Sequence, residues 1–315
     1  MQQLIKFEAW FLNFWFRPAS AVPLAWIRIG FGLTALVNLY YLWALRAEFL
    51  YPGGMLGLDE LKNAVGVYSI FQYLETPTHI DASFVFGLIS ILAVLLGYKT
   101  RLATICCFVW HVSYVAQMVW VCSGWDYLHV VTSFVLMISN CHLHLSLDAR
   151  RYQDIGSAKV GVYPYRILQL QLALLLVVAA YLKFGSYVWR QGSESGHFFL
   201  GAYSLIRTDF FFRAEKLNLF LTHLTLLTEA LVPFFLWQRK SRVLGYTCLL
   251  GLMLAIAPSK VVIYPMLTLT VSLAFLNEDD LQALREFLKI KGIREKATVI
   301  VKECISGLMV YFGKQ

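Results

Sequence analysis

Charged residues are scarce in this sequence. Asp, Glu, Lys and Arg together make up only 15% of it, whereas 59% of the residues are hydrophobic. Soluble domains average about 25% charged and about 45–50% apolar residues. One soluble core cannot bury such an excess of apolar side chains, so the composition argues against an ordinary water-soluble fold. It predicts a membrane protein.

Paired cysteine motifs are also missing. The sequence has six cysteines but no CxxC, and four of them fall within predicted membrane spans, namely Cys106, Cys107, Cys141 and Cys248. A disulfide framework or a thioredoxin-like redox site is therefore unsupported. We interpret these cysteines as small apolar residues that fill gaps between helices.

A cleavable signal peptide is lacking at the start of the sequence. Lys6, Glu8 and Asn13 interrupt the first apolar block, and no small-residue cleavage site follows it. We therefore expect the first true span to act as an uncleaved insertion signal.

Long apolar blocks separated by short polar joints fill most of the chain. About 20 apolar residues cross the roughly 30 Å of hydrocarbon in a bilayer. This length predicts about eight spans, near residues 22–45, 81–98, 102–121, 126–146, 165–184, 217–237, 243–257 and 259–277. The last two are split only by Pro258, Ser259 and Lys260, so they form either a hairpin or one bent, re-entrant pair.

Both ends of the chain differ from this span region of residues 17–277. Residues 1–16 carry Leu4, Phe7, Phe11 and Phe14 at helical spacing, which predicts an amphipathic helix in the membrane interface. Residues 278–315 are basic and intermittently apolar, which predicts an amphipathic tail on the membrane surface.

Lysine and arginine mark alternate joints between the predicted spans. Such cations concentrate on the cytoplasmic side, so both termini are expected to be cytoplasmic, with the chain in the cell membrane. The joint at 185–216 also carries cations, but long loops obey the rule less strictly. The net charge of +8 fits this bias and attraction to anionic membrane lipids, so no nucleic-acid partner is needed.

Polar side chains at membrane depth are costly and often functional. Arg28 lies in the first predicted span, His129 in the fourth, and His223 and Glu229 in the sixth. Arg28 could pair with Glu229 as a structural link or contribute to a binding site. A haem or metal bridge between His129 and His223 is conceivable, but no HxxxH pattern supports one and no metal is predicted.

Several motifs occur in a defined order. They are WIRIGFGL, YPGGMLGL, GYKTRLAT, WDYLH and LSLDARR, followed by LQLQLALLLVVAAYLKFGSYVWRQG and TLLTEALVP. Over about residues 14–277 this ordered set resembles the HTTM domain, the membrane part of the vitamin K-dependent γ-carboxylases and their bacterial relatives. The resemblance implies an all-α, multi-pass transmembrane helical bundle of HTTM type.

The resemblance also implies a chemistry for Lys183. In the animal carboxylases a lysine of this segment deprotonates vitamin K hydroquinone. Reaction with oxygen then gives a strong base that removes a γ-proton from glutamate, and carbon dioxide captures the carbanion. Counting from Gln171 places Lys183 on that lysine, whereas counting back from Trp189 requires one inserted residue. Desolvation between apolar helices would favour the free amine that a base needs. A lysine that snorkels at a helix end is the alternative.

Two departures limit the resemblance. The animal enzymes continue into a large lumenal region, whereas this sequence ends soon after its last predicted span, which leaves carboxylation of a protein open. Their important histidine near the fourth span has no secure equivalent, because the segment here reads WDYLH and His129 is displaced along the helix.

These observations predict an outward-facing cavity with Lys183 as general base. We expect Trp125, Asp126, Gln171, Trp189 and Glu229 to bind the ligand, a reduced quinone of the vitamin K type. The leading hypothesis is a hydroquinone-coupled, carboxylase-like lyase. The alternative is a non-enzymatic membrane module that binds a lipid or quinone, or assists maturation or export of a peptide. Its partners would be membrane lipids and an apolar small molecule or peptide.

Overall fold

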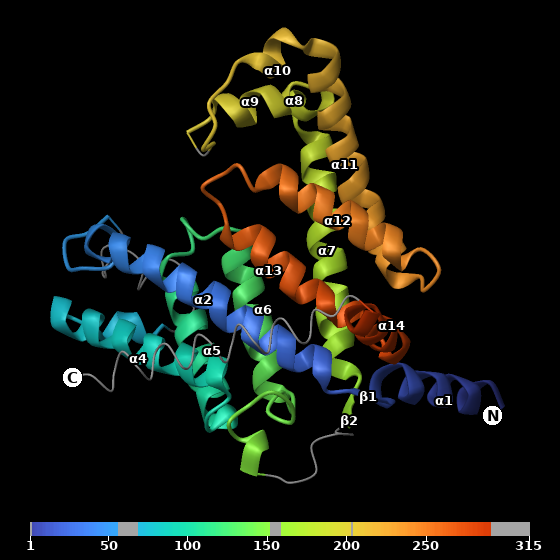
Figure 1. Cartoon of the computed structure of the whole chain (residues 1–315). Helices are drawn as coiled ribbons and strands as arrows, with labels where there is room; N and C mark the ends of the chain where they lie inside the picture. Colours follow the sequence, from blue (N-terminus) through green and yellow to red (C-terminus); the bar gives the residue numbers. More distant parts are fainter. Residues whose placement is uncertain (1, 56–68, 152–158, 203, 291–315) are drawn as a thin grey trace. The chain divides into compact units, whose positions relative to one another are not determined.

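The fold is almost entirely helical, as expected. A computed structural model describes residues 2–55, 69–151, 159–202 and 204–290. Its α-helices are α1 (Gln2–Phe16), α2 (Val22–Phe49), α4 (Pro77–Leu96), α5 (Thr100–Gln117), α6 (Gly124–Ile138), α7 (Tyr163–Gly185), α8 (Tyr187–Arg190), α9 (Glu194–Leu200), α10 (Phe210–Arg213), α11 (Glu215–Trp237), α12 (Arg242–Ile256), α13 (Ile263–Ser272) and α14 (Glu278–Ile290). Figure 1 labels these elements.

Four described helices are long and apolar enough to cross a membrane, namely α2, α4, α7 and α11. Each coincides with one predicted span. The other four predicted spans overlap the shorter helices α5, α6, α12 and α13. These four long apolar helices indicate a membrane protein. The number of membrane crossings stays a prediction.

The predicted span at 126–146 is wrong at its end, because α6 stops at Ile138. After this point the Arg28 side chain donates to the backbone oxygens of Cys141, at 2.9 Å, and Leu145, at 2.5 Å. Leu145 has a φ of +49°, in the left-handed region that is unfavourable for leucine. These contacts hold residues 139–148 in an irregular path that the apolar sequence did not reveal.

The last two predicted spans form two helices, α12 and α13, which contact each other. Between them, the Pro258 oxygen accepts a hydrogen bond from the Leu205 nitrogen at 2.8 Å. Ser259 also forms an isolated antiparallel bridge with Ser204. The joint is therefore tied to the long loop between α7 and α11.

A short β-ribbon departs from the all-α expectation. Strand β1 (Pro18–Ser20) pairs antiparallel with β2 (Lys159–Gly161). The Tyr165 hydroxyl donates to the Ser20 oxygen at 2.6 Å and accepts from the Leu24 nitrogen at 3.2 Å. The ribbon thereby fixes the starts of α2 and α7 side by side.

Helix α2 packs between α4 and α13 (Figure 1). Its two glycines in the GFG sequence make this packing close. A Cβ added at Gly30 would lie 2.6 Å from the Thr270 side chain of α13, and one at Gly32 would lie 2.9 Å from Leu95 of α4. Small residues let membrane helices approach in this way.

The described residues from Leu276 to Ile290 belong to a second unit. Helix α14 begins with Glu278, Asp279 and Asp280, and a reciprocal pair of bonds caps it. The Asn277 nitrogen donates to Asp280 and the Asp280 nitrogen donates to the Asn277 side chain, each at 2.9 Å. The basic part of the predicted tail beyond residue 290 lies outside the described residues, and the interfacial position of α1 stays a prediction.

Candidate functional site

Lys183 and Glu229 meet between α7 and α11. The Lys183 ammonium forms a hydrogen-bonded ion pair with Oε1 of Glu229. Only 1% of the Glu229 side chain is exposed, against 26% for Lys183. A carboxylate so deeply buried needs a partner of opposite charge or must lose its own charge. Lys183 lies in the last turn of α7, where its long side chain reaches this partner.

Trp189 completes a three-residue cluster. Lys183 Nζ lies 4.7 Å from the centroid of the Trp189 ring, within the range of a cation–π contact. This position is possible because α7 ends at Gly185 and the chain turns into α8 after Ser186. Of the residues predicted to form the site, the structure brings together Lys183, Trp189 and Glu229. We call this group the Lys–Glu cluster.

The second oxygen of Glu229 is buried and has no hydrogen-bond partner among the described residues. Buried polar atoms are nearly always paired, so this oxygen calls for a partner such as a water molecule, an ion or a ligand group. Tyr264 of α13 lies within the range of electrostatic interaction with the Glu229 carboxylate. The cluster thus offers an open acceptor next to an aromatic side chain.

Glu194 is a second carboxylate near Lys183 that sequence analysis missed. Burial raises the pKa of the Glu194 carboxyl, while the positive charges of His197 and Lys183 act in the opposite direction. Glu194 starts the short helix α9 in a loop without apolar periodicity. Its proximity to Lys183 arises only in the folded chain, so no local pattern could have indicated it.

The loop between α7 and α11 is anchored beside the cluster. Figure 1 shows α8, α9 and α10 gathered around the N-terminal half of α11. The Gly196 nitrogen donates to the Asn218 side chain at 3.0 Å, and the Ser195 nitrogen donates to the Thr222 hydroxyl at 3.2 Å. These bonds fix α9 against α11 and so position Glu194.

Gln171 and His223 lie apart from the Lys–Glu cluster. Gln171 precedes Lys183 by twelve residues on the same helix, a distance of about 18 Å at about 1.5 Å per residue. His223 is exposed on α11, and its Nδ1 lies 2.9 Å from the Leu219 oxygen. The structure does not join either residue to the cluster.

Asp126 forms a separate buried network at the start of α6. Its Oδ1 accepts from the Tyr114 hydroxyl at 2.9 Å and from Asn38 at 3.3 Å, and its Oδ2 accepts from the Ser123 nitrogen at 2.8 Å. These bonds cap α6 and tie it to α2 and α5. Among the described residues, no hydrogen bond, ion pair or ring contact links Asp126 or the half-buried Trp125 to Lys183.

His129 lies next to this network and is fully buried. Its Nδ1 lies 3.0 Å from the Trp125 oxygen, and its Nε2 lies 3.1 Å from the Thr34 hydroxyl. The His129 ring stacks on His111, with centroids 5.6 Å apart. His129 is therefore accounted for by neighbours in the core. No group of three or more His, Cys, Asp or Glu residues placed to hold a metal was found in the described part of the chain.

The expected pairing of Arg28 with Glu229 is wrong. Arg28 is fully buried, but its guanidinium binds the Cys141 and Leu145 oxygens, while Glu229 pairs with Lys183. Both partners of the expected pair thus have other contacts. Arg28 acts as a brace for the chain that follows α6.

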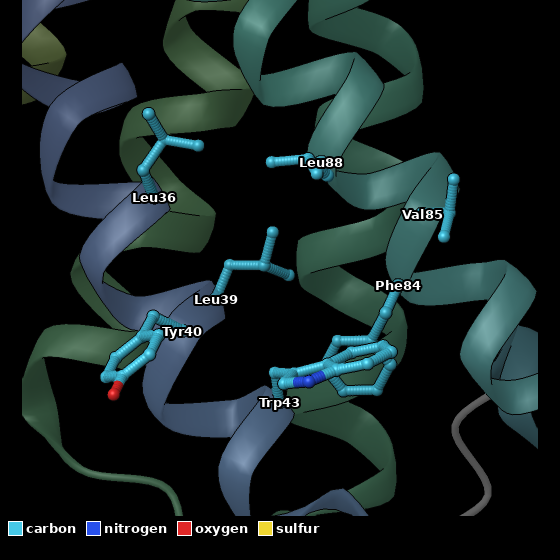
Figure 2. A pocket seen from close by; sticks show the side chains of 7 residues that line it. All are labelled: Leu36, Leu39, Tyr40, Trp43, Phe84, Val85 and Leu88. Carbon is cyan, nitrogen blue, oxygen red and sulfur yellow. The ribbon is translucent and has the colours of Figure 1, made fainter.

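An apolar groove lies between α2 and α4 (Figure 2). It has a volume of about 390 Å³ and is lined by Leu36, Leu39, Tyr40, Trp43, Phe84, Val85 and Leu88. The Trp43 and Phe84 rings meet edge to face, with centroids 5.6 Å apart. The groove can hold an apolar chain, and the Tyr40 hydroxyl is the polar group of a side chain in its otherwise mainly hydrocarbon lining.

Comparison with known proteins gave one match. The model of the HTTM domain matches residues 16–279, which is most of the chain. No curated protein and no solved structure matched. The HTTM domain is found in vitamin K-dependent carboxylase-like membrane proteins. With its long apolar helices and this match over most of its length, the chain belongs to the HTTM domain family of membrane proteins.

Proposed function

We propose that this protein is a membrane-embedded enzyme in which Lys183 accepts a proton from an apolar, hydroxyl-bearing ligand. The observation that carries this proposal is the Lys–Glu cluster, in which an amine pairs with a carboxylate that is 1% exposed. The same carboxylate keeps a buried oxygen without a partner in the described part of the chain. A proton acceptor and an open hydrogen-bond acceptor therefore lie side by side.

The pair has two forms that differ by the position of one proton. In water the charged form, ammonium and carboxylate, is far more stable. The proposed reaction uses the form with a free Lys183 amine and a protonated Glu229, which carries no charge and so avoids the penalty that a site of low dielectric constant places on charge. In that form the Lys183 nitrogen has a free electron pair. It takes the proton of a ligand hydroxyl, the O–H bond breaks, and the new ammonium balances the negative charge left on the ligand oxygen.

The surroundings of the cluster fit an aromatic ligand. Trp189 packs against the lysine nitrogen, and Tyr264 lies near Glu229. A reduced quinone of the vitamin K type would supply an acidic hydroxyl and the electrons for a reaction with oxygen. The most specific version of the proposal is thus a hydroquinone-coupled, carboxylase-like lyase, as the family membership suggests.

The ion pair also supports a second function. If the charged form persists, Lys183 stays protonated and the pair holds α7 and α11 together. The protein would then be a non-enzymatic module that binds a lipid or quinone, or assists maturation or export of a peptide. Replacement of Lys183 separates the two functions.

The proposed topology has about eight spans, with both termini on the cytoplasmic side of the cell membrane. Under this topology the end of α7 that carries Lys183 faces the outer side. The ligand would enter from the outer leaflet or from the outer aqueous phase.

The test measures consumption of a reduced quinone by the purified full chain in lipid nanodiscs. Lys183→Ala and Lys183→Arg should each reduce turnover by about 100-fold or more, the usual contribution of a general base. Arginine cannot replace lysine as the general base because its guanidinium group stays protonated in proteins. Lys216→Ala, which removes an exposed lysine at the start of α11, is the matched control and should retain full activity.

Full activity of the Lys183→Arg protein would contradict the catalytic role. A quinone that co-purifies with the wild type and with Lys183→Arg, in the absence of turnover by either protein, would instead favour the binding module. Mass spectrometry of the extracted lipids makes that distinction.

A further inference from the structure

A second cavity lies where α4 ends and the chain after α6 returns to it. It has a volume of about 430 Å³, and four leucines form most of its lining. Ser146, Ala149 and Arg150 complete the lining. The cavity belongs to different elements from the Lys–Glu cluster, so it is a separate site.

The apolar walls of this cavity are partly exposed. Leu96 is 55% exposed and Leu145 is 51% exposed. Leu145 is held with a positive φ of +49°, and its oxygen accepts a hydrogen bond from the buried Arg28 at 2.5 Å. The backbone strain at Leu145 is therefore supported from inside the bundle, and its side chain is left outside to line the cavity.

One cation lines this cavity and two more lie at the neighbouring turn. Arg150 lines it, and Lys99 and Arg101 lie exposed at the adjoining turn between α4 and α5. The nearby Asp148 carboxylate accepts hydrogen bonds from the backbone N–H of Lys99 at 3.0 Å and from the backbone N–H of Thr100 at 2.7 Å.

Both signs of charge act on the segment that carries the cavity. Burial lowers the pKa of His142, the negative charge of Asp148 opposes this shift, and the positive charges of Arg101 and Arg28 add to it. An anion at this place would meet several cations. Because the leucines lie next to those cations, the complementary molecule must be anionic at one end and apolar at the other.

We propose that this cavity binds one anionic phospholipid. Arg150, Lys99 and Arg101 bind the phosphate of the headgroup, and an acyl chain lies along Leu96 and Leu145. A free phosphate ion would use only the cations and would leave the leucines in water, so the whole lipid is the better fit. The positive-inside pattern places this end of the bundle at the cytoplasmic leaflet, where anionic lipids attract basic segments.

The experiment compares lipid retention by the purified full chain. The protein in detergent is mixed with equal amounts of phosphatidylglycerol and phosphatidylcholine, and native mass spectrometry counts the lipids that remain bound. The wild type should retain phosphatidylglycerol preferentially. Arg150→Gln should weaken that retention about fivefold, the factor expected from one cation near a membrane surface. Lys240→Gln, an exposed cation after α11, is the matched control and should change nothing.

A second variant tests the apolar wall. Leu145→Gly removes the side chain but keeps a backbone that accepts positive φ, so the carbonyl bound by Arg28 remains. It should weaken retention of phosphatidylglycerol without lowering the unfolding temperature in neutral detergent.

Three results would overturn the proposal. They are equal retention of both lipids by the wild type, unchanged retention in Arg150→Gln, and displacement of the lipid by water-soluble glycerol phosphate at the same concentration. The last result would indicate a simple anion site. None of these readouts depends on quinone turnover, so failure here is distinguishable from failure of the proposed enzyme.

Discussion

At the scale of single residues, Lys183 and Glu229 depend on each other. Loss of one partner leaves the other charge with little solvation, and broken buried pairs are strongly destabilising. Lys183→Met and Glu229→Gln should each lower the free energy of unfolding. The double variant should lose less than the sum, with a coupling energy of about 1–3 kcal/mol. Thermal unfolding in detergent measures all four proteins of this cycle.

Arg28 provides the control for that cycle. Its guanidinium binds the Cys141 and Leu145 oxygens and makes no bond to Glu229. Arg28→Met should therefore destabilise by itself, because buried carbonyl groups lose a donor. Combined with Glu229→Gln, its effect should add within about 0.5 kcal/mol. Strong coupling between these two changes would indicate that Arg28 pairs with Glu229, contrary to the structure.

At the scale of helices, Gly30 controls how closely α2 approaches α13. A Cβ at this position would lie 2.6 Å from the Thr270 side chain. Gly30→Ala should thus destabilise by about 1–3 kcal/mol, the usual effect of overpacking. Thr270→Ala removes the clashing atoms and should rescue much of the loss. Unfolding temperatures in detergent compare the two single variants with the double variant.

Gly251 gives the matched comparison for Gly30. It lies in α12, and a Cβ added there would meet no atom within 4 Å. Gly251→Ala should be neutral or slightly stabilising, because alanine has the higher helix propensity. A loss at Gly251 as large as that at Gly30 would mean that the helical backbone, and not the contact with Thr270, explains the effect.

At the scale of the whole molecule, the topology decides which side the Lys–Glu cluster faces. Arg190 follows α7 and Lys240 follows α11, and both are exposed. In intact cells, a membrane-impermeant maleimide should label Arg190→Cys but not Lys240→Cys. Both should react after the membrane is permeabilised. The reverse order of labelling would turn the site toward the cytoplasm and contradict the proposed entry of the ligand from outside.

The sequence by itself determined the long apolar helices of this protein. An apolar run long enough to cross a bilayer satisfies its backbone only as a helix or in a closed barrel, so local composition decides the element. The ordered motifs also indicated the family that the HTTM match confirmed. Sequence also selected Glu229, because a charged residue inside an apolar run is visible without any structure, whereas Lys183 and Trp189 were selected through the resemblance to the HTTM domain.

Only the tertiary structure decided which polar residues meet. Arg28, Lys183 and Glu229 all lie in apolar runs, and charge alone could not tell which cation Glu229 would take. The packing of α7 against α11 brings Lys183 to Glu229. Arg28 instead binds the backbone oxygens of a segment that lies more than 110 residues further along the same chain. Pairing is a property of helix contacts between distant segments, while helix formation depends on neighbours in the chain. This difference in range explains why the elements were predicted well and the partners were not.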